Sequence, residues 1–196
     1  MIRLLSNDIW TTIKKLSQKS KRTKIAVAYF GRGATKQLKL KTGDTLVVAM
    51  GLNNVKSGQV NPFEIEILLD KGVKLFNLSN LHSKIYLFDD KVIVGSANVS
   101  INSENTLIET GILTDDKQTI KEANKFITEN CVEKIERDYI ENCKKNYNPP
   151  KFFGTSKKRK GTKKQTFKGE LSRLWVISTT PSPWKESDYE TTDNDR

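Results

Sequence analysis

The chain has 196 residues, 36% of them hydrophobic, and a formal net charge of +11 at pH 7. This length predicts one domain, with room for an appendage. No apolar run approaches the roughly 20 residues of a membrane span, and the amino terminus lacks the features of a secretory signal, so we expect a cytoplasmic protein. The positive charge favours a polyanionic partner, either nucleic acid or an anionic membrane surface. A basic surface that only confers solubility is the alternative.

The first half of the chain alternates between predicted helices and strands, which is the pattern of an α/β sheet. Ser6 can cap a first amphipathic helix that carries Ile9, Ile13 and Leu16 on one face. The segments that follow are predicted as strands at 24–30, 45–50 and 73–76, a short helical stretch ending at 40, a polar loop at 51–58 and a helix at 62–70.

The first predicted strand is followed by Gly31-Arg32-Gly33. Glycines allow a tight turn from strand to helix, and the amides of such a turn can face a phosphate. The spacing is not that of a Walker motif, so an ordinary turn is the alternative.

Two apolar runs at 85–88 and 92–94 are separated only by Asp89-Asp90-Lys91, which predicts a β-hairpin. With a three-residue turn, Lys84 would lie opposite Ser96 and His82 opposite Asn98. These four polar side chains would share one surface and could bind an anion. A two-residue turn would shift the register by one and move Ser96 and Asn98 to the other face.

Apolar side chains are expected on both faces of this hairpin. The face opposite His82 would carry Ile85, Leu87, Ile93 and Ala97. Strands that are apolar on both faces are typical of a sheet buried on both sides. We therefore expect a mixed β-sheet covered by helices on both faces.

The pattern of His82, Lys84 and Asp89 followed by Gly95-Ser96-Ala97-Asn98 resembles the signature of the phospholipase D superfamily, including its small nucleases and restriction-type endonuclease domains. Six matching positions fall within seventeen residues, although five residues separate Asp89 from Gly95 where members often have six. The resemblance covers residues 24–113. It implies a phospholipase D-like fold and a reaction that needs no metal or other cofactor.

The resemblance also implies roles for these residues. Superfamily members combine two such motifs, each with one histidine, whereas this chain has one motif and one histidine. A homodimer would bring two copies of His82 into one active site, one to attack phosphorus and the other to protonate the leaving oxygen. Lys84, Ser96 and Asn98 would complete the catalytic site, while Asp89 and Gly95 would be structural.

A further strand is predicted at 107–113, and it carries one charged residue, Glu109. A carboxylate in an apolar strand needs a partner. In the superfamily a downstream acid orients the catalytic histidine, so by resemblance Glu109 would bind Nδ1 of His82. Glu104 is the alternative.

One long helix is predicted at 117–145 from apolar residues at helical spacing. Cys131 and Cys143 would lie about 18 Å apart along it, too far for a disulfide. One histidine and two distant cysteines give no zinc-site spacing, so no structural metal is expected. Asn148-Pro149-Pro150 ends the helix, and we place the end of the nuclease-like domain at residue 147.

Residues 148–196 are expected to form a basic mobile arm with a short strand at 174–177 and an acidic, disordered end. We expect Lys157, Lys158, Arg159 and Lys160 to bind substrate phosphates together with Arg32. A tail that only confers solubility is the alternative.

These features together predict a metal-independent phosphodiesterase acting on nucleic acid, a DNA endonuclease with a phosphohistidine intermediate. One alternative is a phospholipid phosphodiesterase with the same site, although no free amphipathic segment suits a bilayer and no membrane partner is expected. A catalytically silent DNA-binding or assembly module is the other alternative.

Overall fold

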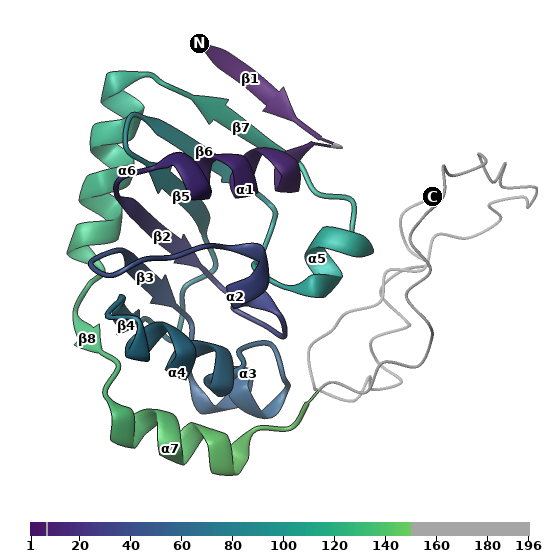
Figure 1. The fold of residues 1–196 in the computed structure, drawn as a ribbon, viewed down its shortest axis with the longest axis vertical. Helices are drawn as coiled ribbons and strands as arrows, with labels where there is room; N and C mark the ends of the chain where they lie inside the picture. The colour runs from purple at the N-terminus through teal and green to yellow at the C-terminus, as the bar shows by residue number, and fades with distance from the viewer. Residues whose placement is uncertain (7, 150–196) are drawn as a thin grey trace, which may run out of the picture. The chain divides into compact units, whose positions relative to one another are not determined.

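The computed structural model describes residues 1–6 and 8–149, which form an eight-stranded sheet with helices on both faces (Figure 1). The strands are β1 (Ile2–Leu5), β2 (Thr23–Val27), β3 (Thr45–Val48), β4 (Lys74–Asn77), β5 (Lys84–Phe88), β6 (Lys91–Gly95), β7 (Gly111–Thr114) and β8 (Glu133–Lys134). The helices are α1 (Ile9–Lys19), α2 (Ala34–Gln37), α3 (Leu52–Lys56), α4 (Pro62–Asp70), α5 (Ile101–Asn105), α6 (Lys117–Glu129) and α7 (Arg137–Asn146). The predicted mixed sheet covered on both faces is therefore confirmed.

The strand order is β1-β7-β6-β5-β2-β3-β4-β8. β2, β3 and β4 are parallel neighbours, whereas β5 runs antiparallel to β2. The strands β6, β7 and β1 continue the antiparallel half of the sheet. The hairpin formed by β5 and β6 is consequently an interior part of the sheet, with hydrogen-bonded strands on both sides.

The two faces of the sheet are buried against different helices. Ile25 and Val27 of β2 belong to the larger core, to which α1 and α4 contribute, while Ala26 packs in a smaller core with Ala123 and Ile127 of α6. Side chains alternate between faces along a strand, so neighbouring residues of β2 enter different cores. Burial of apolar surface on both faces holds the central strands in place.

The hairpin turn has two residues, Asp89 and Asp90, rather than the three assumed from the sequence. Phe88 pairs directly with Lys91. Asp89 has a left-handed backbone, with φ of 43°. Aspartate tolerates this conformation better than most residues, which permits the tighter turn.

This register moves the side chains at the open end of the hairpin. Continued by one residue beyond the pair of Ile85 and Val94, it places Lys84 opposite Gly95. The predicted pairings of Lys84 with Ser96 and of His82 with Asn98 are therefore wrong. A shift of one residue exchanges the two faces of a strand.

The predicted common face of four apolar hairpin residues is wrong for the same reason. Ile93 and Ala97 lie in the larger core together with Tyr86, whereas Ile85 and Leu87 contribute to the smaller core. The hairpin is still buried on both faces, as its apolar residues predicted.

The long helix predicted at 117–145 is two helices. α6 ends at Glu129 and is capped by Asn130, whose side-chain Nδ2 donates to the Phe126 carbonyl at 2.8 Å. β8 then pairs with β4 at the edge of the sheet. Ile127 packs in the smaller core and Ile140 in the larger, so the chain passes from one face of the sheet to the other. The apolar spacing continues across this break, which made two helices look like one.

Cys131 and Cys143 consequently lie in different cores, and both thiols are free. Burial raises the pKa of each thiol above its ordinary value. A raised pKa leaves less thiolate, so neither cysteine has the character of a nucleophile.

Four short elements were not predicted: β1 and β8 at the two edges of the sheet, α3 within the 51–58 loop, and α5 after the hairpin. The predicted cap Ser6 is also wrong, because Asp8 occupies the N-cap position of α1. Apart from its first two residues, the predicted arm at 148–196 lies outside the described residues.

Candidate active site

The candidate site lies at the N-terminal end of β5, an interior strand of the sheet. His82 lies two residues before the start of this strand and is exposed. Its ring meets the Tyr29 ring edge-on, with centroids 6.4 Å apart and planes at 75°. Lys84 Nζ donates to the His82 carbonyl oxygen at 2.8 Å and lies 3.4 Å from His82 Nε2. An imidazole and an ammonium are thus held together on an open surface.

Partial burial lowers the pKa of Lys84 below its ordinary value, and attraction to the Glu109 carboxylate opposes this shift. Burial disfavours the charged form because it removes water from the ammonium. A less hydrated ammonium also interacts more strongly with a phosphate oxygen. The lysine is therefore placed to bind an anion at the His82 ring.

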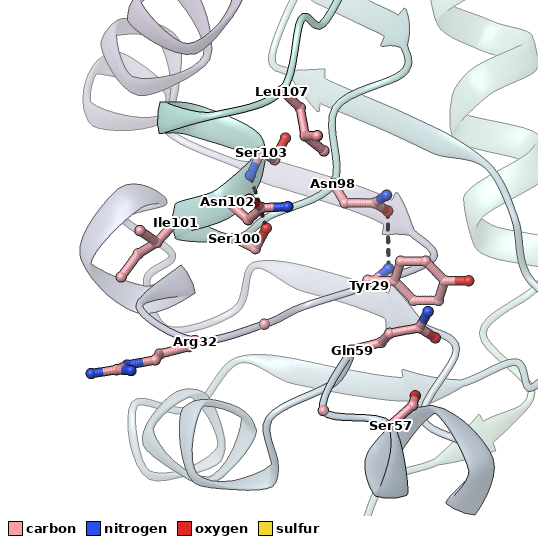
Figure 2. Close-up of a pocket in the computed structure, with 12 residues that line it drawn as sticks. Tyr29, Arg32, Ser57, Gln59, Asn98, Ser100, Ile101, Asn102, Ser103 and Leu107 are labelled. Carbon is pink, nitrogen blue, oxygen red and sulfur yellow. Dashed lines mark hydrogen bonds between the residues drawn. The ribbon is translucent and has the colours of Figure 1, made fainter. Parts of the chain in front are cut away.

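Asn98 is fixed by the segment that follows β2. The Tyr29 backbone amide donates to Asn98 Oδ1 at 3.1 Å, as the dashed line in Figure 2 shows. Because a backbone N–H can only donate, the acceptor is the amide oxygen, and the Nδ2 group faces elsewhere. No hydrogen bond from this Nδ2 to any residue of 1–6 or 8–149 is present. It remains free to donate to a substrate.

Glu109 lies two residues before β7, not inside a strand as predicted. The residue is only 7% exposed, and its carboxylate accepts hydrogen bonds from Ser96 Oγ and from Ser103 Oγ, the latter at 2.6 Å. Trp10 Nε1 donates in turn to Ser103 Oγ at 3.3 Å. These hydroxyls satisfy a carboxylate that would otherwise be costly to bury.

The predicted contact between Glu109 and Nδ1 of His82 is not part of this geometry. The hydrogen bonds of the described residues include none between these two side chains. Glu104, the alternative, pairs with Lys14 and accepts from Gln37 Nε2 at 2.8 Å. Glu109 instead reaches the site through Ser96 and through its charge near Lys84.

Ser96 directly follows β6, and its hydroxyl forms hydrogen bonds with the two residues that precede β7. Besides donating to Glu109, its Oγ accepts from the Thr110 backbone amide at 3.0 Å. The adjoining Gly95 leaves room for this approach, since a Cβ there would lie 2.7 Å from the Gly111 Cα. Only glycine fits such close backbones, so this position shapes the site without touching substrate.

Asp89 lies at the far end of the hairpin, away from His82. Its two carboxylate oxygens accept from the backbone amides of Lys21 and Arg22, each at 2.9 Å. These bonds tie the hairpin turn to the segment that precedes β2. The geometry gives the aspartate of the motif a role in the fold.

The Gly31-Arg32-Gly33 turn is occupied by a carboxylate of the chain itself. Glu64 accepts from the Gly33 amide at 2.7 Å and from the Thr35 amide at 3.0 Å. These amides are therefore not free for a phosphate. Arg32 is exposed, and its guanidinium makes no ion pair within the described ranges. Lys157, Lys158, Arg159 and Lys160 lie outside these ranges.

A cavity of about 330 Å³ adjoins the site (Figure 2). It lies between two chain segments that run side by side, 29–32 and 98–103, and the loop at 57–59. Tyr29 and Asn98 line it, so the cavity shares two residues with the surroundings of His82.

Three residues of the site were missed from the sequence: Trp10, Tyr29 and Ser103. Tyr29 belongs to an apolar run, where an aromatic residue is typical of core, and Ser103 lies in a polar connection. Trp10 and Ser103 are 93 residues apart and meet only in the folded chain. No local pattern marks such a pair.

No three histidine, cysteine or acidic side chains gather into a metal-binding group within 1–6 and 8–149. Over the same residues, no helix is both long enough and apolar enough to span a membrane.

Comparisons with known proteins agree with this fold. The family model "Cardiolipin synthase, PLD-like domain" matches residues 12–130. NucT from Helicobacter pylori is 21% identical with a TM-score of 0.51, and the match covers 68% of this chain and 98% of that protein. Nuc from Salmonella typhimurium, a phospholipase D family member, is 12% identical with a TM-score of 0.53, over 69% of this chain and 96% of that protein. No curated protein matches the chain. The family match extends over more than half of the sequence, and the chain therefore belongs to the phospholipase D superfamily, whose members are phosphodiesterases.

Proposed function

We propose that this protein is a metal-independent phosphodiesterase that cleaves nucleic acid, with DNA as its main substrate. Its active site is shared by two copies of the chain. The observation that carries the proposal is the exposed His82 ring beside Lys84 at the N-terminal end of β5. It is the only histidine in the sequence.

The first step transfers the phosphoryl group to histidine. The neutral His82 ring attacks phosphorus, a P–N bond forms, and the P–O bond to the leaving oxygen breaks. A proton must reach that oxygen from the opposite side, and His82 of the partner subunit supplies it in its protonated form. Lysine is a poor acid at neutral pH, and no second histidine exists in one copy.

The second step returns the enzyme to its starting state. Water attacks the phosphohistidine, the P–N bond breaks, and the partner's His82, now neutral, takes the proton from the water. In both steps negative charge develops on the phosphoryl oxygens. The ammonium of Lys84 and the unoccupied Nδ2 of Asn98 donate to these oxygens, which stabilises the transition state.

Ser96 and Glu109 act as positioning residues in this scheme. Ser96 holds the start of β7 through Thr110, and Glu109 holds Ser96 and attracts the Lys84 ammonium. Neither side chain is required to touch the substrate.

The charge of the chain supports nucleic acid as the substrate. A net charge of +11 attracts a polyanion, and each neutralised phosphate adds to the salt dependence of binding. Arg32 is exposed beside the site, and Lys157, Lys158, Arg159 and Lys160 form a second cationic group in the sequence. We assign phosphate contacts to these five residues.

A nicking assay on supercoiled plasmid in the presence of EDTA tests the proposal, with His82→Ala as the control. We expect nicking by the natural sequence and none by the variant. Release of headgroups from anionic vesicles without DNA cleavage would instead indicate a lipid phosphodiesterase. DNA binding with neither activity would indicate a silent module, and a strict requirement for Mg²⁺ would contradict the histidine mechanism.

A further inference from the structure

We propose that the cavity beside His82 binds one unpaired nucleobase adjacent to the scissile phosphate, so that the preferred substrate is single-stranded or locally unpaired nucleic acid. This inference rests on the proposed function and adds to it the form of the substrate.

The position of the cavity connects it to the reacting phosphate. The Tyr29 ring contacts the His82 ring, and Tyr29 is also one of the residues that line the cavity. Asn98 lines the cavity too, while its Oδ1 is held by the Tyr29 amide. A nucleotide whose phosphate lies at His82 would therefore direct a neighbouring base toward this cavity.

The walls of the cavity are fixed by backbone hydrogen bonds. The Gly31 amide donates to the Val99 carbonyl at 2.8 Å, and the Ile101 amide donates to the Arg32 carbonyl at 3.2 Å. A Cβ at Gly31 would lie 3.1 Å from Ser100 Cβ, so the two segments are in close contact. The cavity is thus formed before a ligand arrives, which reduces the entropy lost on binding.

The lining suits a planar heterocycle. No carboxylate lines the cavity. Tyr29, Ile101 and Leu107 provide apolar and aromatic surface for a ring face (Figure 2). The side-chain amides of Gln59 and Asn102 make no hydrogen bond within the described chain, so both donors and acceptors are available to the edge of a base.

This lining does not suit an acyl chain, which would leave these amides without partners. A base inside a duplex is stacked on both sides and paired along its edge, so it must leave the helix to enter such a cavity. A volume of about 330 Å³ is at the small end for a ligand site and suits one nucleotide unit rather than a duplex. The Arg32 side chain extends outward from the cavity in Figure 2, where it can meet the next phosphate.

The test compares three substrates of one sequence: a single-stranded oligonucleotide, its duplex, and the single strand with one abasic residue. The abasic residue removes a base and leaves every phosphate in place. We expect the natural sequence to cleave the single strand at least about tenfold faster than the duplex, and to cleave phosphates next to the abasic residue about tenfold more slowly.

Leu107→Trp fills the cavity from a side chain that is 53% exposed. We expect this variant to cleave the intact strand about tenfold more slowly and to be insensitive to the abasic residue, because the base no longer binds. Ile67→Trp on α4 is the matched control, since this residue is 42% exposed and does not line the cavity. It should behave like the natural sequence, and thermal unfolding should show that both variants fold.

Equal rates on duplex and single strand, or an abasic effect that persists in Leu107→Trp, would overturn the assignment while leaving the phosphodiesterase function intact. Failure to cleave any oligonucleotide would refute the function itself. The two failures are therefore distinguishable.

Discussion

The two ends of the β5–β6 hairpin use acidic residues in different ways. At the turn, Asp89 accepts from two backbone amides and is exposed. At the open end, the buried Glu109 accepts from two side-chain hydroxyls and lies near Lys84. One carboxylate therefore fixes the course of the chain, and the other fixes the side chains of Ser96 and Ser103.

This difference separates stability from catalysis within a single motif. Changes at the turn should mainly alter the free energy of unfolding, because the partners there are backbone groups. Changes at the open end should mainly alter rate, because His82 is exposed and Glu109 acts on Ser96 and on the charge of Lys84.

The largest expected effect is from His82→Ala. Removal of the nucleophile should lower the cleavage rate by at least ~10³-fold. The His82 side chain is exposed, so the melting temperature should remain near that of the natural sequence. Single-turnover cleavage and thermal unfolding measure the two quantities, and a large drop in melting temperature would show that the histidine is part of the fold.

Lys84→Met should lower kcat by roughly 10²–10³-fold, since it removes a cation from the developing charge. In the natural sequence, burial lowers the pKa of Lys84, so the ammonium is lost at a lower pH than for an ordinary lysine. The rate should therefore decline on the alkaline side below pH 10.5, the ordinary lysine value. Lys84→Arg keeps its charge and should move this decline to higher pH. A pH–rate profile that is the same for lysine and arginine would contradict this role.

Glu109→Gln should reduce the rate about 10- to 100-fold, as expected for weakened hydrogen bonds to a charged group. Glu109 raises the pKa of Lys84 by its charge, so removing the charge should lower that pKa further. The alkaline decline in rate should then move to lower pH. A drop in rate without this movement would mean that Glu109 acts only through Ser96.

The smallest effect on rate is expected at the turn. Asp89→Gly removes the hydrogen bonds to the amides of Lys21 and Arg22, while glycine can still adopt the left-handed backbone conformation of this position. The substitution should lower the free energy of unfolding by about 1–2 kcal/mol. Asp89→Asn keeps one acceptor oxygen and should cost less. Urea denaturation measures both. Normal cleavage at low temperature by Asp89→Gly would support the comparison, whereas a loss of rate in the folded variant would contradict it.

Local patterns were sufficient for most elements of the fold. The α4 helix begins at Pro62 and ends at Asp70 as predicted, because proline suits the first helical position and Asn61 caps the helix. The two strands of the hairpin were predicted from their β-branched and aromatic residues. Each of these signals lies within the segment that it describes.

The errors arose where distant residues decide the geometry. The hairpin register depends on the left-handed backbone of Asp89, which a charged three-residue turn does not reveal. The position of the Glu109 carboxylate depends on a hydrogen bond from Ser103, which in turn accepts a hydrogen bond from Trp10. The motif supplied the candidate residues of the site, but their contacts could not be predicted from spacing alone.

The central claim is that two copies of His82 serve one site. Differently tagged natural and His82→Ala chains can be mixed, and the heterodimer isolated by two affinity steps. On DNA, a shared site predicts almost no cleavage by the heterodimer, because the remaining histidine has no acid opposite it.

A diester with a p-nitrophenolate leaving group provides the decisive comparison, since this group departs without a proton. The heterodimer should release one equivalent of p-nitrophenolate in a rapid burst and then stall, because the second step still needs the missing histidine as base, while the His82→Ala homodimer should show no burst. Rapid release from the diester together with loss of DNA cleavage is the result expected of a shared site. Half of the natural activity on DNA in the heterodimer, or full activity in a monomer, would contradict it.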